Sequence, residues 1–375
     1  MKAIAVHNQR DEYDIYIGRA VPEVGLEASK WGNPFVMADE SDAERDRAIA
    51  QYREWILDQP ELMAALGELR GRRLGCWCAP KRCHGDVLAE LAETTNTNDI
   101  EVLRSWIGKT EERVETLSVS HANQLAQTLE RDPLLRAGDP LGPLWHFTTH
   151  LPSTKLSELD EDGHSFRGGF LPPVALPRRM WAGGRITFHG ELLLGEEVEK
   201  RSTIDHIEMK QGRSGQLCFV TVNHVLSVEG NVRLSEEQDL VFLEYPTESS
   251  PKPKPQTAPQ EFDFTRSVTP SAALLFRYSA LTLNAHRIHY DRDFARDVEG
   301  YPNVVVHGPL TATLLADLAV SETGRALTSF SFRSVAPLFD GESFGLFGAV
   351  HDDSLSLWAA SPDGRLAMQA TATVA

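Results

Sequence analysis

The residues best suited to chemistry are concentrated in the segment NAHRIHYD, at residues 284–291. Its polar members include Asn284, His286, Arg287, His289 and Asp291. Histidine ionises near neutral pH, so an imidazole can take up and return a proton there. Burying an unpartnered imidazole or amide costs about 1–3 kcal/mol, so this density beside apolar segments indicates a functional site.

A second polar group, His307 and Gly308, comes shortly before the apolar run TATLLADLAV. The run predicts a buried helix that begins near Gly308. The first N–H groups of a helix have no intrahelical acceptor and lie at the positive end of its dipole. The backbone N–H of Gly308 can therefore stabilise negative charge that develops on an oxygen.

The segment NAHRIHYD resembles the motif of the MaoC-like, R-specific enoyl-thioester hydratases, in which Asp-x-Asn-Pro-Leu-His precedes the central helix of a hot-dog fold. On this motif His289 matches the catalytic histidine, and Asn284 stands at the aspartate position. The residues of NAHRIHYD resemble those of one subfamily, the type 2 hydroxyacyl-thioester dehydratases and the related mesaconyl-C4-CoA (3-methylfumaryl-CoA) hydratases. The resemblance continues through WIGKTEER, PLGPLWHF, RGGFLPPVALPRRMWAGGRITFH and DLVFLEY, so it covers residues from about 100 to 375.

This resemblance implies a hydro-lyase that reversibly adds water to an α,β-unsaturated acyl thioester, or removes it from a 3-hydroxyacyl thioester, without a cofactor. Such a reaction requires a base that activates water at the β-carbon and donors that hold the enolate oxygen. The base is expected to be His289, the group that orients water Asn284, and the oxygen donor the N–H of Gly308. His307 is a further candidate for substrate contact. Because an amide cannot take a proton from water as a carboxylate can, Asn284 is a chemical departure from the motif.

Four arginines are candidates for substrate binding. The resemblance places Arg178 and Arg179 along the acyl-thioester channel, where they would meet phosphates of CoA or of an acyl carrier; a solvated surface pair is the alternative. A dicarboxylic acyl group such as mesaconyl would need another cation near its distal carboxylate. Arg277 and Arg287 are the candidates for that contact.

Other functions stay open at this level. A hot-dog thioesterase would release free thiol from an acyl-CoA. A non-catalytic acyl-CoA-binding module would bind without turnover, with Asn284 as the cause. In a third interpretation, the N-terminal segment carries the main role by binding a nucleotide or a metal.

The expected fold class is α+β, a double hot dog whose two lobes each wrap a curved antiparallel sheet around a central helix, preceded by a small α/β domain. The predicted domains are residues 1–95, a first lobe at 99–246, a proline-rich linker at 247–263 and a second lobe at 264–375 that carries the motif. In the first lobe, PLGPLWHF is expected to start the central helix. Gly183 and Gly184 are expected in a loop where backbone approaches the ligand.

The N-terminal segment has a separate cluster in CWCAPKRCHGD. Cys76, Cys78, Cys83 and His84 fall within nine residues, and thiolates with an imidazole are suitable ligands for zinc. The spacing is not that of a standard zinc finger, and buried core thiols or a reactive thiol are alternatives. Residues 1–95 also resemble a small uncharacterised domain of bacteria and phages with the words YIGR, SKWGNPF and CWC…CHGD. A pocket for an anion such as phosphate would be lined by Arg19, Lys30, Asn33, Arg82, His84 and Asp86.

Length and charge limit the remaining classes. A chain of 375 residues predicts more than one domain. The net charge of −17 argues against nonspecific binding to nucleic acids or anionic membranes. No apolar run approaches the ~20 residues of a membrane span, and the acidic N-terminus is unlike a signal peptide. We therefore expect a cytoplasmic monomer or homodimer whose partner is an acyl-CoA or acyl-carrier thioester.

Overall fold

The computed structural model describes residues 3–69, 71–94, 97–132, 134–212, 215–246 and 254–375. The α-helices are α1 Asp42–Leu57, α2 Pro60–Ala65, α3 His84–Thr94, α4 Ile100–Arg104, α5 Val119–Thr128, α6 Ala272–Leu281, α7 Arg292–Asp297 and α8 Gly308–Thr323. The strands are β1 Ile4–His7, β2 Ile15–Tyr16, β3 Arg73–Cys76, β4 Thr110–Thr116, β5 Arg178–Phe188, β6 Glu197–Gly212, β7 Gly215–Val228, β8 Asn231–Leu243, β9 Phe264–Val268, β10 Leu327–Ser334, β11 Phe344–His351, β12 Ser354–Ala360 and β13 Leu366–Val374.

Contacts divide the chain into two compact units. The first comprises the residues up to Leu103 with Thr154–Asp160 and Ser165–Ala175, and the second comprises Arg104–Ser153, Glu161–His164 and Leu176–Ala375. Two stretches from the middle of the sequence thus belong to the N-terminal unit. Part of the expected linker, residues 247–253, lies outside the described residues.

The first unit is a small α/β fold around a parallel sheet with the order β1-β3-β2. Ser41 caps α1 as its spacing to Glu44 predicts, because its Oγ accepts the Glu44 N–H at 3.3 Å. The apolar spacing over residues 41–69 predicts a single helix, and that prediction is wrong. The helix ends at Leu57 and restarts at Pro60, since proline has no N–H to continue a helix and fits its first turn.

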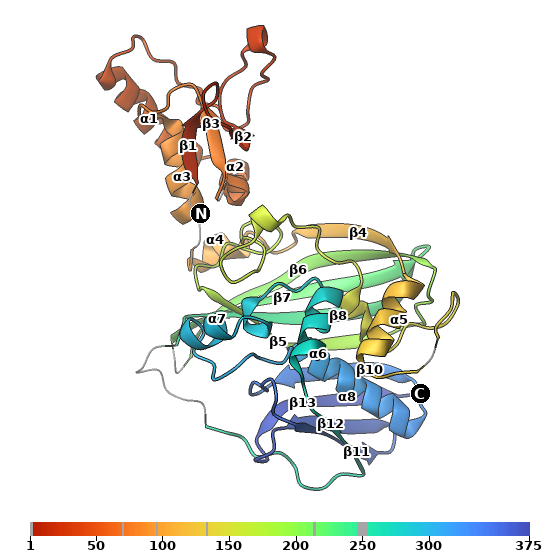
Figure 1. Cartoon of the computed structure of the whole chain (residues 1–375). Coiled ribbons are helices and arrows are strands. Elements are labelled where there is room, and N and C mark those ends of the chain that lie inside the picture. The colour runs from red at the N-terminus through yellow and green to blue at the C-terminus, as the bar shows by residue number, and fades with distance from the viewer. Residues whose placement is uncertain (1–2, 70, 95–96, 133, 213–214, 247–253) are drawn as a thin grey trace. The chain divides into compact units, whose positions relative to one another are not determined.

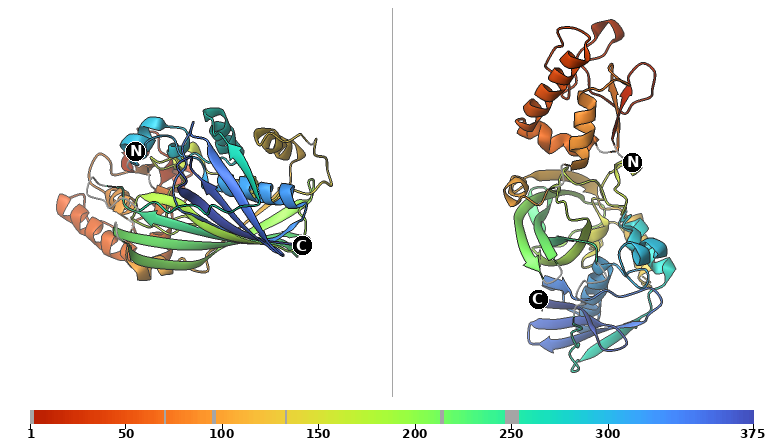
Figure 2. Two further views of the ribbon diagram at one scale, coloured as in Figure 1. Left: turned by 90° about the horizontal axis from the view of Figure 1, so that it is seen from below. Right: turned by 90° about the vertical axis from the view of Figure 1, so that its left-hand side faces the viewer.

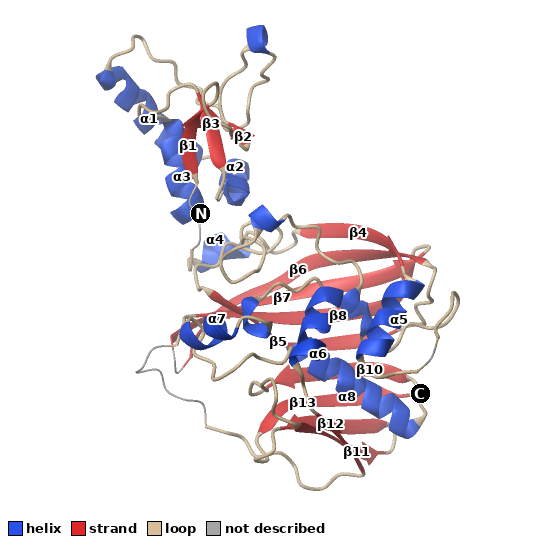
Figure 3. Cartoon of the chain, viewed as in Figure 1, coloured by secondary structure: helices blue, strands red, loops and turns tan. Residues whose placement is uncertain are grey.

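The second unit is built on one ten-stranded antiparallel sheet, with the order β4-β6-β7-β8-β5-β10-β13-β12-β11-β9 (Figure 1). Strands β4 to β8 form the first lobe and β9 to β13 the second, and the pairing of β5 with β10 joins them edge to edge. Helices α5, α6 and α8 lie on one face of this sheet (Figure 3). The sheet curves around α8 (Figure 2). This architecture confirms the double hot dog.

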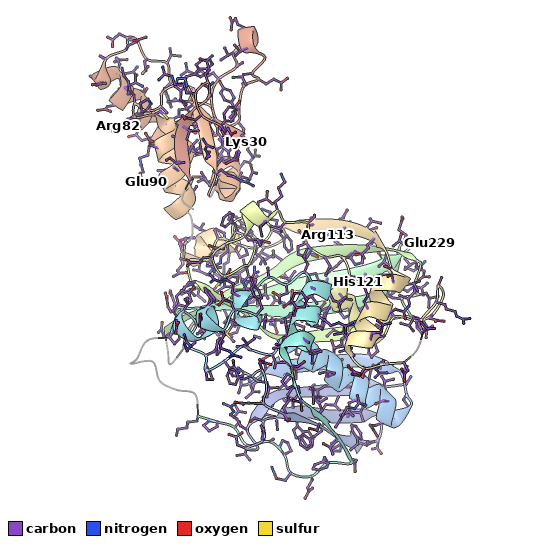
Figure 4. All side chains as sticks on the ribbon, viewed as in Figure 1. Lys30, Arg82, Glu90, Arg113, His121 and Glu229 are labelled. Atoms are coloured by element: carbon purple, nitrogen blue, oxygen red, sulfur yellow. The ribbon has the colours of Figure 1, made fainter. Side chains whose placement is uncertain are left out.

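Helix α8 is the central helix of the second lobe, as its apolar sequence predicts. Ten consecutive residues from Leu310 to Ala319 are buried, which a helix can sustain only when protein covers it on all sides. Helix α5 packs beside the second lobe, and His121 on α5 donates its Nε2–H to the carbonyl of Leu281 at 3.0 Å (Figure 4). The two lobes therefore share one apolar core.

The expected central helix of the first lobe was placed wrongly at PLGPLWHF. That segment forms only a 3-10 turn, Trp145–Thr148, because Leu144 before it adopts a positive φ of 62° that stops a right-handed helix from extending. The helix of this lobe is α5. The sequence predicts Ser120 before HANQLAQTL as its N-cap, but the cap is Ser118, whose Oγ accepts the His121 N–H.

Gly183 and Gly184 lie in β5 and not in a ligand-facing loop, which corrects that expectation. A Cβ on Gly183 would collide with the backbone carbonyl of Phe332 in β10, and one on Gly184 would come within 2.9 Å of the Phe332 ring. The two glycines therefore allow the close approach of the strands that join the lobes. No helix in the described part of the chain has the length and apolarity to cross a membrane.

Candidate active site

His289 lies in the 3-10 turn Arg287–His289 between α6 and α7, and it is buried. Its Nδ1 is 2.8 Å from the carbonyl oxygen of Val305, which can only accept, so Nδ1 carries the proton. The Nε2 lone pair is then available, and no hydrogen bond to it is formed within the described residues. Burial, followed by the neighbouring His286, lowers the pKa of His289 to about 3. The imidazole is therefore neutral near pH 7, with an Nε2 lone pair that can accept a proton.

His307 is stacked on His289, with ring centroids 3.7 Å apart and planes at 18°. It is fully buried, and its Nε2 lies 2.8 Å from the Oγ of Ser279 on α6. Burial, then His289, lowers the pKa of His307 well below its usual value. A neutral His307 can hold the flat face of His289 in place without adding a repelling charge.

Gly308 is the first residue of α8, directly after His307 at the N-cap. In the described residues its backbone N–H has no protein acceptor, as expected for the first position of a helix. The N-terminus of a 16-residue helix adds partial positive charge at this place. The N–H of Gly308 thus meets the requirement for an oxyanion donor.

Asn284 is half-buried at the entrance to the same loop. Its Oδ1 accepts the backbone N–H of His286 at 3.0 Å, which closes a tight turn. The turn uses the amide oxygen and leaves the NH₂ group as a donor. Asn284 can therefore hold an oxygen atom by hydrogen bonding but cannot accept a proton from water.

A loop from the first half of the chain supports this segment. Gly163 has a φ of +89°, and a Cβ at this position would collide with the carbonyl of Ala285. The Arg287 N–H donates to the carbonyl of Asp162 at 2.9 Å. The backbone of residues 161–164 therefore packs directly on the histidine-bearing loop.

Asp162 and His164 were not predicted as site residues. Their side chains are hydrogen-bonded at 2.9 Å, and the His164 ring lies 4.2 Å from that of His286. Although burial opposes it, the bond and charge of His164 lower the pKa of Asp162. The ligand atoms of Asp162, His164 and His286 lie within 4.8 Å of one another, close enough to share a cation. The sequence signal that could have identified this pair is the spacing of Asp162, Gly163 and His164.

Arg178 is placed in a buried ion pair. Its Nε is 2.5 Å from Oε2 of Glu299, and its Nη2 donates to the hydroxyl of Tyr301 at 2.8 Å. The other oxygen of Glu299 lies 3.5 Å from Nε2 of His286. Arg178 thus neutralises a carboxylate behind the histidine loop instead of facing solvent. Glu299 had no local sequence signal, since it stands 121 residues from Arg178.

The other three arginines differ in their surroundings. Nε and Nη2 of Arg287 both donate to Asp291, at 3.0 and 2.7 Å, and its guanidinium lies over the Phe294 ring. Arg277 is exposed on α6, next to the buried Tyr278. Arg179 is half-buried on β5. The guanidinium of Arg287 is thus paired with Asp291 of the same loop. The Arg277 side chain is exposed and lies outside the buried site.

The first lobe holds a second buried polar cluster that the sequence did not reveal. His146 Nε2 is 3.2 Å from Glu236 Oε2, and His224 contacts Ser202 Oγ at 2.8 Å and Gln238 Oε1 at 3.1 Å. Both nitrogens of His224 are therefore occupied. Burial, followed by the charge of Lys200, lowers the pKa of His224 to about 4.

A family model described as hydroxyacyl-thioester dehydratase type 2 matches residues 144–340. A mesaconyl-C(4)-CoA hydratase of Chloroflexus aurantiacus is 47% identical over 269 residues, 71% of this chain and 96% of that protein. The chain belongs to the type 2 hydroxyacyl-thioester dehydratase family. It is therefore a carbon–oxygen lyase that acts on acyl thioesters. A mitochondrial type 2 dehydratase of Schizosaccharomyces pombe is 28% identical over 226 residues, 53% of this chain and 74% of that protein.

Two solved structures share the fold. HtdX of Mycobacterium tuberculosis superposes with a TM-score of 0.54 at 20% identity, covering 71% of this chain and all of HtdX. A MaoC-like dehydratase superposes with a TM-score of 0.55 at 17% identity, covering 72% of this chain and 99% of that one. The type 2 dehydratase part of the chain is thus a double hot dog.

The N-terminal segment has its own relatives. A model for DUF4326, a domain of unknown function, matches residues 4–94. An uncharacterised 12.4 kDa protein of Enterobacteria phage T4 is 31% identical over 101 residues, 26% of this chain and 83% of that protein. The predicted resemblance to an uncharacterised bacterial and phage domain is confirmed.

Proposed function

We propose that this type 2 dehydratase family member hydrates mesaconyl-C4-CoA at His289. The observation that carries the proposal is the fixed, neutral imidazole, whose Nδ1–H is held by Val305 and whose Nε2 forms no hydrogen bond in the part of the chain that the structure describes. The mesaconyl group is supported by the 47% identity to the Chloroflexus aurantiacus hydratase, nearly all of whose length is covered.

In the proposed reaction Nε2 of His289 takes a proton from water as the water oxygen bonds to the β-carbon. The π electrons move to the α-carbon and the thioester oxygen, where the N–H of Gly308 stabilises the enolate. His289 then returns the same proton to the α-carbon, so no second acid is consumed. Asn284 orients the water through its NH₂ group. One histidine suffices because a group that gained a proton becomes the acid for the next step.

The neighbouring imidazoles have positioning roles in this proposal. Ser279 fixes His307 through Nε2, and His307 stacks on His289 at 3.7 Å. Arg178 and Glu299 form an ion pair, and the second oxygen of Glu299 lies next to His286. We assign Arg178 no direct contact with phosphates of CoA, because its guanidinium is buried and paired.

Recognition of a distal carboxylate must use other groups than Arg287, whose guanidinium is bound to Asp291, or Arg277, which is exposed on α6. Those two arginines therefore give the dicarboxylate assignment no support. Substrate preference is best decided by direct comparison of acyl groups.

The test is the loss of conjugated enoyl-thioester absorbance when the full chain meets mesaconyl-C4-CoA and, separately, crotonyl-CoA. Turnover of mesaconyl-C4-CoA with a much higher kcat/KM is expected. Preference for crotonyl-CoA would overturn the substrate, and release of free thiol would mark a thioesterase. Binding of either thioester without turnover would mark the non-catalytic module.

A further inference from the structure

The cysteine and histidine cluster of the DUF4326 segment forms a buried group in the first unit. Cys76, Cys83 and His84 are 3%, 3% and 6% exposed, and one ligand atom from each lies within 4.8 Å of the others. Adjacent donor atoms around a four-coordinate zinc ion are typically about 3.3–3.8 Å apart, as follows from bonds of about 2.0–2.3 Å in a tetrahedron. A small contraction would therefore close the three donors on one ion.

The orientation of His84 matches that of a metal ligand. Its Nε2 lies 2.8 Å from the carbonyl oxygen of Ile17, so Nε2 carries the proton. The lone pair of Nδ1 then points toward the Sγ of Cys76, 4.0 Å away. A backbone carbonyl that holds the remote N–H of an imidazole is a common second contact at metal sites, because it fixes the tautomer and the ring.

The fold brings these donors together at one edge of the sheet. Cys76 ends β3 and His84 begins α3, so both lie where the strands of the parallel sheet end. The Gly85 N–H donates to Cys83 Sγ at 3.2 Å, a contact that stabilises a thiolate. A Cβ on Gly85 would come within 3.1 Å of that sulfur and 2.7 Å of the Ile17 side chain. Glycine is therefore required for this backbone to pack against the thiol.

Cys78 and Arg45 complete the surroundings. The half-buried Cys78 is two residues after Cys76, and the Arg45 guanidinium donates to the carbonyl of Arg82, next to Cys83, at 3.4 Å. Arg45 is only 8% exposed, and its Nε is buried without a hydrogen-bond partner in the described structure. A buried cation with an unused donor favours a neighbouring negative charge. Three thiolates, one imidazole and a divalent ion carry a net charge of about −1, which a guanidinium would balance.

We propose that Cys76, Cys83 and His84, with Cys78 as fourth ligand, bind one zinc ion in the DUF4326 unit. The ligand atoms come from a strand end, a loop and a helix start, so the ion would fix how these three elements meet. Because the ligand set is closed by protein groups, the ion would be structural and not catalytic. The role is independent of the hydratase reaction at His289.

The experiment uses the full chain, reduced, incubated with excess zinc, freed of unbound metal by gel filtration and analysed by elemental mass spectrometry. About one zinc per chain is expected for the wild type, and less than about 0.2 for Cys83→Ser and for His84→Ala. Cys218→Ser is the matched control, because Cys218 is a buried cysteine on β7 of the other unit. It should keep the wild-type zinc content.

Two further measurements separate a ligand set from ordinary core thiols. His84→Cys should retain about one zinc per chain, because four thiolates also bind zinc, whereas a purely structural histidine would give no such rescue. Cobalt(II) in place of zinc should show the thiolate-to-metal absorption of a tetrahedral site. Wild-type chain below about 0.1 zinc after loading, or undiminished zinc in Cys83→Ser and His84→Ala, would overturn the proposal.

Discussion

The two hot-dog lobes each bury histidines, yet they use the hydrogen-bonding capacity of these residues differently. In the first lobe, both ring nitrogens of His224 are bonded to side chains, and His146 is paired with Glu236. In the second lobe, Nε2 of His286, Nδ1 of His307 and Nε2 of His289 form no hydrogen bond within the described residues. Satisfied histidines stabilise a core, whereas chemistry needs one whose lone pair is left for the substrate.

The largest contrast is expected for substitution of one histidine in each lobe. His289→Ala should lower kcat by about 10²–10⁴-fold, the usual share of a general acid–base group. His224→Ala should keep kcat within a few-fold and lower the free energy of unfolding by about 1–3 kcal/mol, since it leaves Ser202 and Gln238 unpaired. Steady-state kinetics and urea unfolding measure the two effects. A His289→Ala enzyme with near wild-type turnover would remove His289 from the mechanism.

The junction of the lobes gives the next largest effect. Asp317 on α8 is paired with Arg131, which follows α5, and with Arg266 on β9. Asp317→Ala should cost about 2–3 kcal/mol of unfolding free energy, less than the 3–5 kcal/mol of a fully buried pair because both arginines are about one-third exposed. Urea unfolding checks this value, with Asp353→Ala at an exposed pair as control. Equal, small losses for both variants would show that the Asp317 pair does not tie the lobes together.

Ser279 tests whether His307 acts by positioning His289. Ser279→Ala removes the partner of His307 Nε2 and should lower kcat about tenfold, the equivalent of a lost hydrogen bond of about 1.4 kcal/mol. KM should change little, and Ser279→Thr should recover part of the rate because it restores a hydroxyl. A change confined to unfolding free energy, with kcat unaltered, would make Ser279 a packing residue only.

The smallest expected effects concern pH. With a pKa of about 3, His289 stays unprotonated far below the usual 6.5, so kcat/KM should show no histidine limb between pH 5.5 and 7.5. A fall with an apparent pKa near 6.5 would contradict a buried, neutral base.

In the first lobe, burial raises but His146 lowers the pKa of Glu236, and the net value is about 2. Because the folded pKa lies below the unfolded one, this stabilisation is present above about pH 4.5 and is lost as pH falls toward 2. Glu236→Gln should flatten that part of the stability curve in acid unfolding followed by circular dichroism.

Local patterns predicted most elements of the second lobe. The apolar run after Gly308 could only be a covered helix, and the alternating runs from residue 327 became β10 to β13. The helix of the first lobe was harder to predict. PLGPLWHF combines prolines with apolar residues, and the positive φ of Leu144 prevents it from forming an α-helix. The part of β5 up to Gly184 was expected to be a loop. Its glycines permit the close approach of β10, and no local sequence pattern indicates that contact.

The sequence by itself determined the family and the candidate active-site loop, because the candidates Asn284, His286 and His289 lie within one short segment. It also determined the cysteine cluster, whose members are neighbours along the chain. Only the tertiary structure decided which charges are free. Arg178 could have bound a phosphate, but Glu299, 121 residues away, pairs with it inside the protein. The position of the proton on His289 was decided in the same way, since the backbone carbonyl of Val305 binds Nδ1 and leaves Nε2 without a hydrogen bond in the described residues.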